Sequence, residues 1–149
     1  MQNGYTSEEY YRRVLIPIIE KERKRLYESP FAQFLKNEGV QKCMEEGGVK
    51  YALQNRNHPY NFEGKSIPLR EIVGRLSKVN LEGLVGDISK CYQNAREAIQ
   101  KRGGNAEATK QALDLCDSLE AEDKENAAKI HAMGRKFNKR IYFFEIFGQ

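Results

Sequence analysis

Apolar residues recur along most of the chain at steps of three and four, the spacing of one face of an α-helix. The most regular run begins at Leu81 and continues to Ile99, and similar runs cover residues 106–119 and 127–144. Shorter runs lie near residues 14–26 and 69–79. Because no stretch alternates like a strand with turn signals on both sides, the pattern predicts an all-α fold.

Residues that favour helix ends fall between these runs. Thr6 or Ser7 can cap the first helix, with Glu9 completing a Thr-x-x-Glu capping box, and Asn80 and Asn105 can cap later helices. We expect Pro17 to kink the first helix, because proline lacks the N–H that an interior helical position donates.

Glycines suggest further boundaries. The pair Gly47–Gly48 predicts a break within residues 40–55, and we place a turn near Glu122 before the last helix. Gly83 and Gly86 lie inside a regular helix, where each costs about 1 kcal/mol relative to alanine. We therefore expect a neighbouring helix to approach the backbone closely at these two positions.

One long segment lacks helical periodicity. Residues 57–66 read Asn-His-Pro-Tyr-Asn-Phe-Glu-Gly-Lys-Ser, a composition typical of turns and loops. We interpret this segment as a polar hinge loop that joins two small helical bundles. The predicted domains are an N-terminal helical lobe over residues 1–56 and a C-terminal helical bundle over residues 67–149.

Basic residues accumulate on the last helix, where Lys129, Arg135, Lys136, Lys139 and Arg140 occur with no acidic residue among them. Arg135/Lys139 and Lys136/Arg140 are like-charge pairs one turn apart, and each such pair destabilises a helix by roughly 0.2–0.5 kcal/mol. An anionic surface would offset this cost, and the phosphate backbone of nucleic acid is the commonest such surface. A solvated helix face is the alternative interpretation. The apolar stripe of this helix falls on other positions, namely Ala127, Ile130, Met133, Phe137, Ile141 and Phe144.

The other candidate residues for phosphate contacts lie on two earlier helices. They are Arg12, Arg13, Arg70, Arg75 and Lys78. The formal net charge is +4, yet residues 114–125 are rich in aspartate and glutamate. Surfaces of opposite sign suit a subunit that contacts both nucleic acid and partner proteins. Because no segment resembles a base-reading module, we expect RNA or DNA to be bound independently of its sequence.

Aromatic residues accompany some of these basic residues. Tyr5, Tyr10 and Tyr11 lie beside Arg12 and Arg13, and aromatic rings between cations can stack the bases of single strands. The same rings can fill the edge of a helical bundle, which is the interpretation we favour.

Groups that perform catalysis are scarce in the sequence. Phosphate-loop, zinc-protease and serine-hydrolase motifs are absent, and the chain has only two histidines, His58 and His131. Cys43, Cys91 and Cys116 stand far apart inside apolar runs, which indicates buried thiols of a reducing cytosol. No apolar run approaches the ~20 residues that a membrane span needs. We therefore expect a cytoplasmic, non-catalytic protein without a catalytic residue, metal site, cofactor, small-molecule substrate or membrane partner.

Two passages resemble a known family. His58-Pro59, the segment from Gly64 to Arg70, and Gly74-Arg75-Leu76 resemble the Gly-x-Ser-Leu-Gly … Leu-x-x-Leu passage of CasB-type proteins, the small subunits of CRISPR type I-E Cascade complexes. Residues 114–139, ending in Met133-Gly134-Arg135-Lys136-Phe137, are similar to that family's Asp-Leu … Trp-x-Arg-x-Phe passage, with Met133 near the position of the tryptophan. The resemblance covers residues 55–140. It implies an all-helical, two-lobed, non-catalytic subunit that holds crRNA or the displaced DNA strand in an RNA-guided antiviral complex.

These observations favour a basic, non-catalytic subunit that binds nucleic-acid backbone and partner subunits. The alternative is a protein–protein interaction module, such as a phage-type inhibitor or adaptor, whose basic residues bind an acidic partner surface. A peripheral membrane protein and a small enzyme rank behind these two. Salt-sensitive binding to arbitrary oligonucleotides would separate the first two hypotheses.

Overall fold

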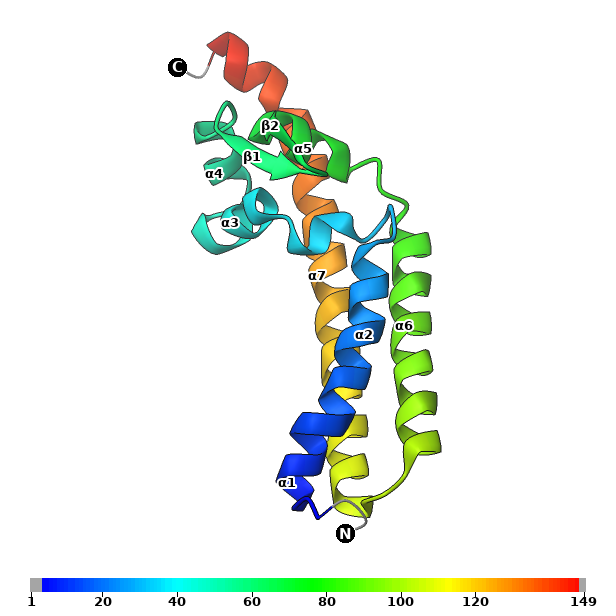
Figure 1. The fold of residues 1–149 in the computed structure, drawn as a ribbon. Coiled ribbons are helices and arrows are strands. Elements are labelled where there is room, and N and C mark those ends of the chain that lie inside the picture. The colour runs from blue at the N-terminus through cyan, green and yellow to red at the C-terminus, as the bar shows by residue number, and fades with distance from the viewer. Residues whose placement is uncertain (1–3, 148–149) are drawn as a thin grey trace. The chain divides into compact units, whose positions relative to one another are not determined.

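The computed structural model describes residues 4–147, and these residues are mostly helical, which confirms the predicted all-α fold class apart from one short hairpin (Figure 1). Residues 1–3 and 148–149, which the predicted lobes include, lie outside the described residues. In chain order the elements are α1 (Ser7–Tyr10), the π-helical turn η1 (Tyr11–Leu15), α2 (Ile16–Tyr27), the 3-10 turn η2 (Gln33–Lys36), α3 (Glu38–Glu46), α4 (Val49–Gln54), β1 (Pro59–Phe62), β2 (Lys65–Pro68), α5 (Leu69–Leu76), α6 (Leu81–Arg102) and α7 (Ala106–Phe147).

Packing divides the chain into two compact units whose boundaries differ from the predicted lobes 1–56 and 67–149. The first unit holds the residues up to Ser29 together with Val85–Lys124, and the second holds Pro30–Leu84 and the residues from Glu125 onward. The segment expected to be a hinge, residues 57–66, lies inside the second unit. The difference has a physical reason: units are defined by contacts between segments far apart in the sequence, which local periodicity does not show.

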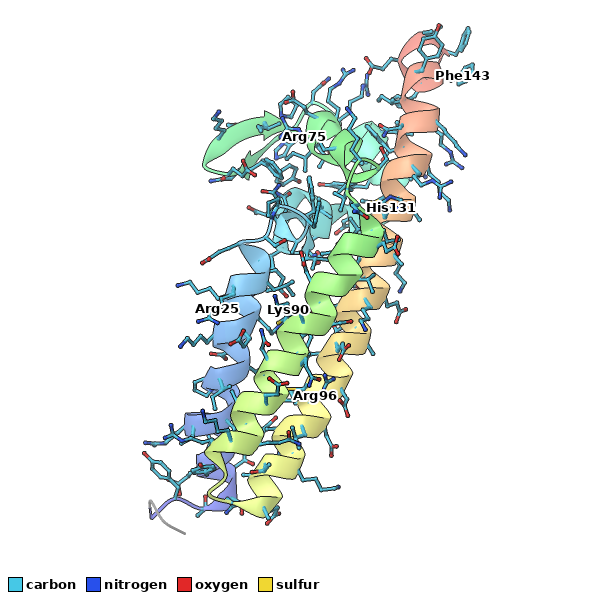
Figure 2. All side chains as sticks on the ribbon, turned by 90° about the vertical axis from the view of Figure 1, so that its right-hand side faces the viewer. Arg25, Arg75, Lys90, Arg96, His131 and Phe143 are labelled. Carbon is cyan, nitrogen blue, oxygen red and sulfur yellow. The ribbon has the colours of Figure 1, made fainter. Side chains whose placement is uncertain are left out.

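The first unit is built from three helical segments. The helix formed by α1, η1 and α2 lies beside the portions of α6 and α7 that belong to this unit, as both views show (Figures 1 and 2). The predicted capping box begins the first helix: Thr6 Oγ1 accepts the Glu9 N–H at 3.1 Å, and Glu9 Oε1 accepts the Thr6 N–H at 3.4 Å. The buried side chains of this unit include Leu15, Ile19, Leu26, Ile88, Tyr92, Ile99 and Cys116.

A π-helical turn over Tyr11–Leu15 precedes Pro17, where we expected a kink. Just before this turn, Tyr10 is buried, and its hydroxyl donates to the carbonyl of Gly103 at 2.7 Å. Two constraints favour glycine at position 104. Its φ of +95° is a conformation that favours glycine, and a Cβ there would clash with the Tyr10 hydroxyl. The predicted Asn105 cap follows, with Oδ1 accepting the Ala108 N–H at 2.9 Å.

The acidic stretch is largely neutralised within the first unit. Tyr92 donates to the buried carboxylate of Asp123, which also lies 3.7 Å from the Arg23 guanidinium. Arg96 binds Asp117 at 2.9 Å and also pairs with Glu120. Our expected turn near Glu122 is wrong, because α7 continues without a break for 42 residues. The acidic residues on either side of Glu122 pair with Arg23, Arg96 and Lys124.

The second unit contains a hairpin where we predicted an irregular loop without strands. β1 and β2 pair antiparallel, with Phe62 opposite Lys65 and a two-residue turn between them. Both turn residues are left-handed, Glu63 with φ 53° and Gly64 with φ 81°, as a type I′ turn requires. Phe62 and Ile67 bury their side chains, so the hairpin is part of the core of this unit.

Helix α5 packs antiparallel against the second half of α7 through residues on one side of that helix. Gly134 of α7 faces the C-terminal end of α5. A Cβ added at Gly134 would be 2.5 Å from Leu76 Cβ and 2.9 Å from the backbone nitrogen of Ser77. Asn138, one turn later, donates to the carbonyl of Gly74 at 3.1 Å, and Glu145 pairs with Arg70. The spacing of 134, 138 and 145 places these contacts along one face of α7.

We predicted that a neighbouring helix approaches the backbone closely at Gly83 and Gly86, and this prediction is wrong. A Cβ at Gly83 would meet side chains, with Phe31 Cε2 at 3.1 Å, and a Cβ at Gly86 would meet nothing within 4 Å. The close backbone approach occurs at Gly134. Steric demand of this kind depends on which helix lies opposite, so a glycine in an amphipathic run does not reveal it.

These contacts predict opposite effects for two glycine-to-alanine substitutions. Gly134→Ala should destabilise the protein by roughly 1–3 kcal/mol, because α5 must move to admit the methyl group. Gly86→Ala should stabilise it by up to about 1 kcal/mol, because alanine is the better helix former and the site is open. Thermal and urea unfolding followed by circular dichroism measure both changes. A stabilising Gly134→Ala would contradict the close packing of α5 on α7.

Candidate nucleic-acid interface

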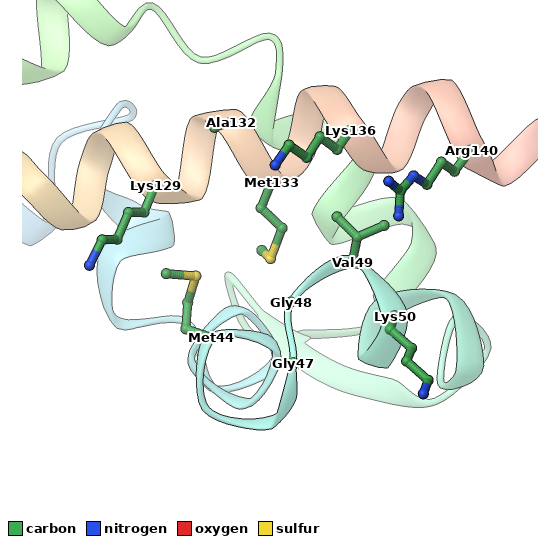
Figure 3. A pocket seen from close by; sticks show the side chains of 10 residues that line it. All are labelled: Met44, Gly47, Gly48, Val49, Lys50, Lys129, Ala132, Met133, Lys136 and Arg140. Atoms are coloured by element: carbon green, nitrogen blue, oxygen red, sulfur yellow. The ribbon is translucent and has the colours of Figure 1, made fainter.

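A groove of about 470 Å³ opens in the second unit between α7 and the turn that joins α3 to α4 (Figure 3). The α7 wall is formed by Lys129, Ala132, Met133, Lys136 and Arg140. The opposite wall is formed by Met44, Gly47, Gly48, Val49 and Lys50. Four cationic residues therefore line one concave surface, and none of the described residues lining it is acidic.

The turn from α3 to α4 depends on two glycines in left-handed conformations. Gly47 has φ 115° and Gly48 has φ 69°, and both donate their N–H to the carbonyl of Cys43. Neither site is crowded, so it is the backbone conformation that favours glycine here. The predicted break at Gly47–Gly48 is thus confirmed, and it places Val49 and Lys50 across the groove from α7.

The cations of the α7 wall share one side of the helix because of their spacing in the sequence. Lys129, Lys136 and Arg140 are separated by seven and four residues, which places them on one face of the helix. Met133 is 5% exposed and faces Met44 across the bottom of the groove, whereas the ammonium end of Lys50 points away from α7 (Figure 3). The groove consequently has an apolar floor with cations along its rim.

Two of these cations carry uncompensated charge. Lys129 pairs with Glu125 at 2.9 Å, so part of its charge is already neutralised. Within residues 4–147, no carboxylate lies within ion-pair distance of Lys136 or Arg140, which stand one turn apart. A bound anion would relieve the repulsion between them.

The structure assigns different surroundings to the basic residues predicted from sequence in the first unit. Arg12 pairs with Glu8 at 3.2 Å, and Arg13 lies over the ring of Tyr5, 5.7 Å from its centroid. Tyr10 is buried in this unit, which agrees with the favoured interpretation that this aromatic ring fills the bundle. These two arginines therefore have local partners and do not line the groove.

The predicted residues of the second unit also divide into paired and unpaired groups. Arg70 binds both carboxylate oxygens of Glu145, and Arg75 lies 4.0 Å from Glu71 and over the Phe62 ring. Lys78 is exposed outside the groove. On α7, the exposed residues Arg135 and Lys139 lie about 100° around the helix from Lys136 and Arg140. Of the nine predicted residues, the groove brings together Lys136 and Arg140.

Lys50 and Lys129 line the groove and are not among the nine residues predicted from the sequence. Lys129 lies seven residues before Lys136, so the helical spacing of the sequence already indicates that both lie on one face. Lys50 could not be found in this way, because its placement opposite α7 depends on the tertiary packing of the Gly47–Gly48 turn.

The last turns of α7 expose large apolar side chains. The exposed fractions are 66% for Tyr142, 60% for Phe143, 48% for Ile146 and 74% for Phe147. Figure 2 shows Phe143 projecting from the C-terminal end of the helix. By contrast, Phe144 is half-buried beneath the Arg56 guanidinium, which lies 4.9 Å from its ring centroid.

Comparison with family models, with curated proteins and with solved structures finds no match. The resemblance to CasB-type subunits therefore stays a prediction.

Among residues 4–147, no three or more His, Cys, Asp or Glu side chains gather as metal ligands would. In the same range, no helix combines the length and apolar character needed to cross a bilayer.

The three cysteines are buried free thiols, as the sequence predicted. Burial raises the pKa of Cys43 and of Cys116 to about 11 and that of Cys91 to about 12. Burial has this effect because it disfavours the charged thiolate. These groups accordingly remain protonated at neutral pH.

We expect the native protein to resist thiol reagents at pH 8. With a pKa of about 11, roughly 0.1% of a thiol is ionised at that pH, and the thiolate is the reactive form. Ellman's reagent should therefore modify the folded protein very slowly and release three equivalents after unfolding in guanidinium chloride. Rapid modification of one cysteine in the folded protein would show that this thiol is accessible to solvent.

Proposed function

We propose that this chain is a non-catalytic subunit that binds the phosphate backbone of nucleic acid along the groove between α7 and the α3–α4 turn. The observation that supports it is the pair Lys136 and Arg140, which line the groove one turn apart without a carboxylate partner in the described part of the chain. Phosphate oxygens would neutralise both residues and release counterions from the nucleic acid.

The chemistry of the groove favours recognition without base specificity. Its rim offers ammonium and guanidinium groups, which position a phosphate backbone and carry no sequence information. Its floor is formed by Met44 and Met133, whose thioethers are weak acceptors and cannot read base edges by strong hydrogen bonds. Binding is thus independent of base sequence in this proposal.

The narrower hypothesis is a CasB-type role, in which the chain holds crRNA or displaced DNA within a cytoplasmic antiviral complex. Its support is the resemblance over residues 55–140. Neighbouring genes for crRNA processing and for backbone subunits would test it, and the groove proposal does not depend on the outcome.

A matched pair of double variants tests the groove. Lys136→Gln with Arg140→Gln removes the two unpaired groove cations, and Arg135→Gln with Lys139→Gln removes the same charge from the adjacent face of α7. Anisotropy titrations of a labelled oligonucleotide over a range of salt concentrations should show weaker binding for the first variant. Its log–log salt slope should fall by about 1.4 in magnitude for a single strand, while the second variant changes little. Neither should melt at a lower temperature, because all four side chains are exposed and each variant removes one like-charge pair.

Two results would overturn the proposal. Equal losses of affinity in both variants would mean that charge acts diffusely, without a groove. A salt-independent affinity of the unsubstituted protein would mean that phosphate is not the ligand. If polyglutamate competes as well as an oligonucleotide of equal charge, the alternative of an acidic protein partner is favoured instead.

A further inference from the structure

The aromatic end of α7 continues the cationic face of the groove. Lys129, Lys136 and Arg140 are followed by Phe143 and Phe147, at steps of seven, four, three and four residues. This spacing places all five on one face of the helix, over a length of about 27 Å at the α-helical rise. The same face therefore offers cations first and exposed rings next.

The two rings are arranged as a platform. Phe143 and Phe147 are 60% and 74% exposed, their centroids lie 6.3 Å apart, and their planes differ by 20°. Tyr142 lies edge-on to Phe143, with a centroid distance of 5.5 Å, and supports it from the side. Exposed apolar clusters that are bordered by charged residues commonly mark binding sites.

We infer that the nucleic acid bound by this chain is single-stranded, with its phosphates on Lys136 and Arg140 and unpaired bases stacked on Phe143 and Phe147. This inference rests on the proposed function of the groove. In a duplex the bases are paired and stacked on one another, so isolated rings on a helix reach them poorly. In a single strand each base presents a π-face, and stacking accepts every base.

Other occupants fit the charge pattern less well. In a two-fold symmetric dimer through this face, Lys136 and Arg140 of one copy would lie near the same residues of the other copy, which is repulsive. A bilayer-binding helix separates an apolar face from a basic face. Here the two kinds of residue share each face, since Arg135, Lys139, Tyr142 and Ile146 form a second mixed row.

The test compares a platform variant and a second-row variant on three ligands. Phe143→Ala with Phe147→Ala removes the platform, and Ile146→Ala removes one exposed apolar residue from the second row. The ligands are a single-stranded oligonucleotide, its duplex, and an abasic oligonucleotide with the same number of phosphates. Stacking changes affinity by roughly 5- to 150-fold per base. The unsubstituted protein should therefore prefer the single strand to the abasic ligand by at least about tenfold. The platform variant should lose this preference, and the second-row variant should keep it.

A spectroscopic measurement reports stacking directly. The chain contains no tryptophan, so Phe143→Trp introduces a single tryptophan on the platform, which can be excited selectively over the tyrosines. Its emission should be quenched by the single strand and not by the abasic ligand at the same saturation. Abasic binding and the salt slope should be unchanged in the platform variant, because its phosphate contacts remain.

The outcomes separate this inference from the proposed function. Equal affinity for single-stranded and abasic ligands, with the groove variant still impaired, would overturn the stacking platform and leave phosphate binding in place. No binding to any of the three ligands would overturn both. If the platform variant loses self-association or binding to anionic phosphatidylserine vesicles while its oligonucleotide affinities stay unchanged, the rings serve another partner and the inference is wrong.

Discussion

The absence of a side chain at Gly134 is the constraint on which the second unit depends. It allows the end of α5 to lie against the α7 backbone, and the Asn138 and Glu145 contacts then extend the pairing along the same side of the helix. Because α5 occupies that side, α3 and α4 meet another face of α7, where the groove is lined by Lys136 and Arg140. The groove and the α5 contact thus occupy different sides of α7.

The sequence predicted features that depend on neighbours within four residues. The Thr6 cap, the Asn105 cap and the Gly47–Gly48 break were predicted correctly, because each is set by local backbone hydrogen bonds. The hairpin was missed, since two four-residue strands carry too few alternating positions to stand out beside Pro and Asn. Continuity of α7 through Asp123 was missed because its partner, Tyr92, is distant in sequence.

The same distinction explains the mixed outcome for the candidate site. Arg70 and Arg140 are equally basic and equally helical in the sequence. In the structure, Arg70 is held by Glu145, 75 residues away along the chain, and Arg140 lines a groove with no acidic neighbour among the described lining residues. Whether a surface cation is paired is a property of tertiary packing. A basic pattern therefore locates a helix that can bind anions, and the fold selects the residues.

The π-helical turn at Tyr11–Leu15 makes the first unit sensitive to chain length at that point. Such a turn accommodates one residue more than an α-helical turn, and each residue rotates an α-helix by about 100°. Loss of a single residue there would restore a regular α-helix and swing Tyr10 away from the carbonyl of Gly103. The chain connection that follows α6 would then lose the hydroxyl that closes it. Point substitutions keep this register, whereas an insertion or a deletion shifts it.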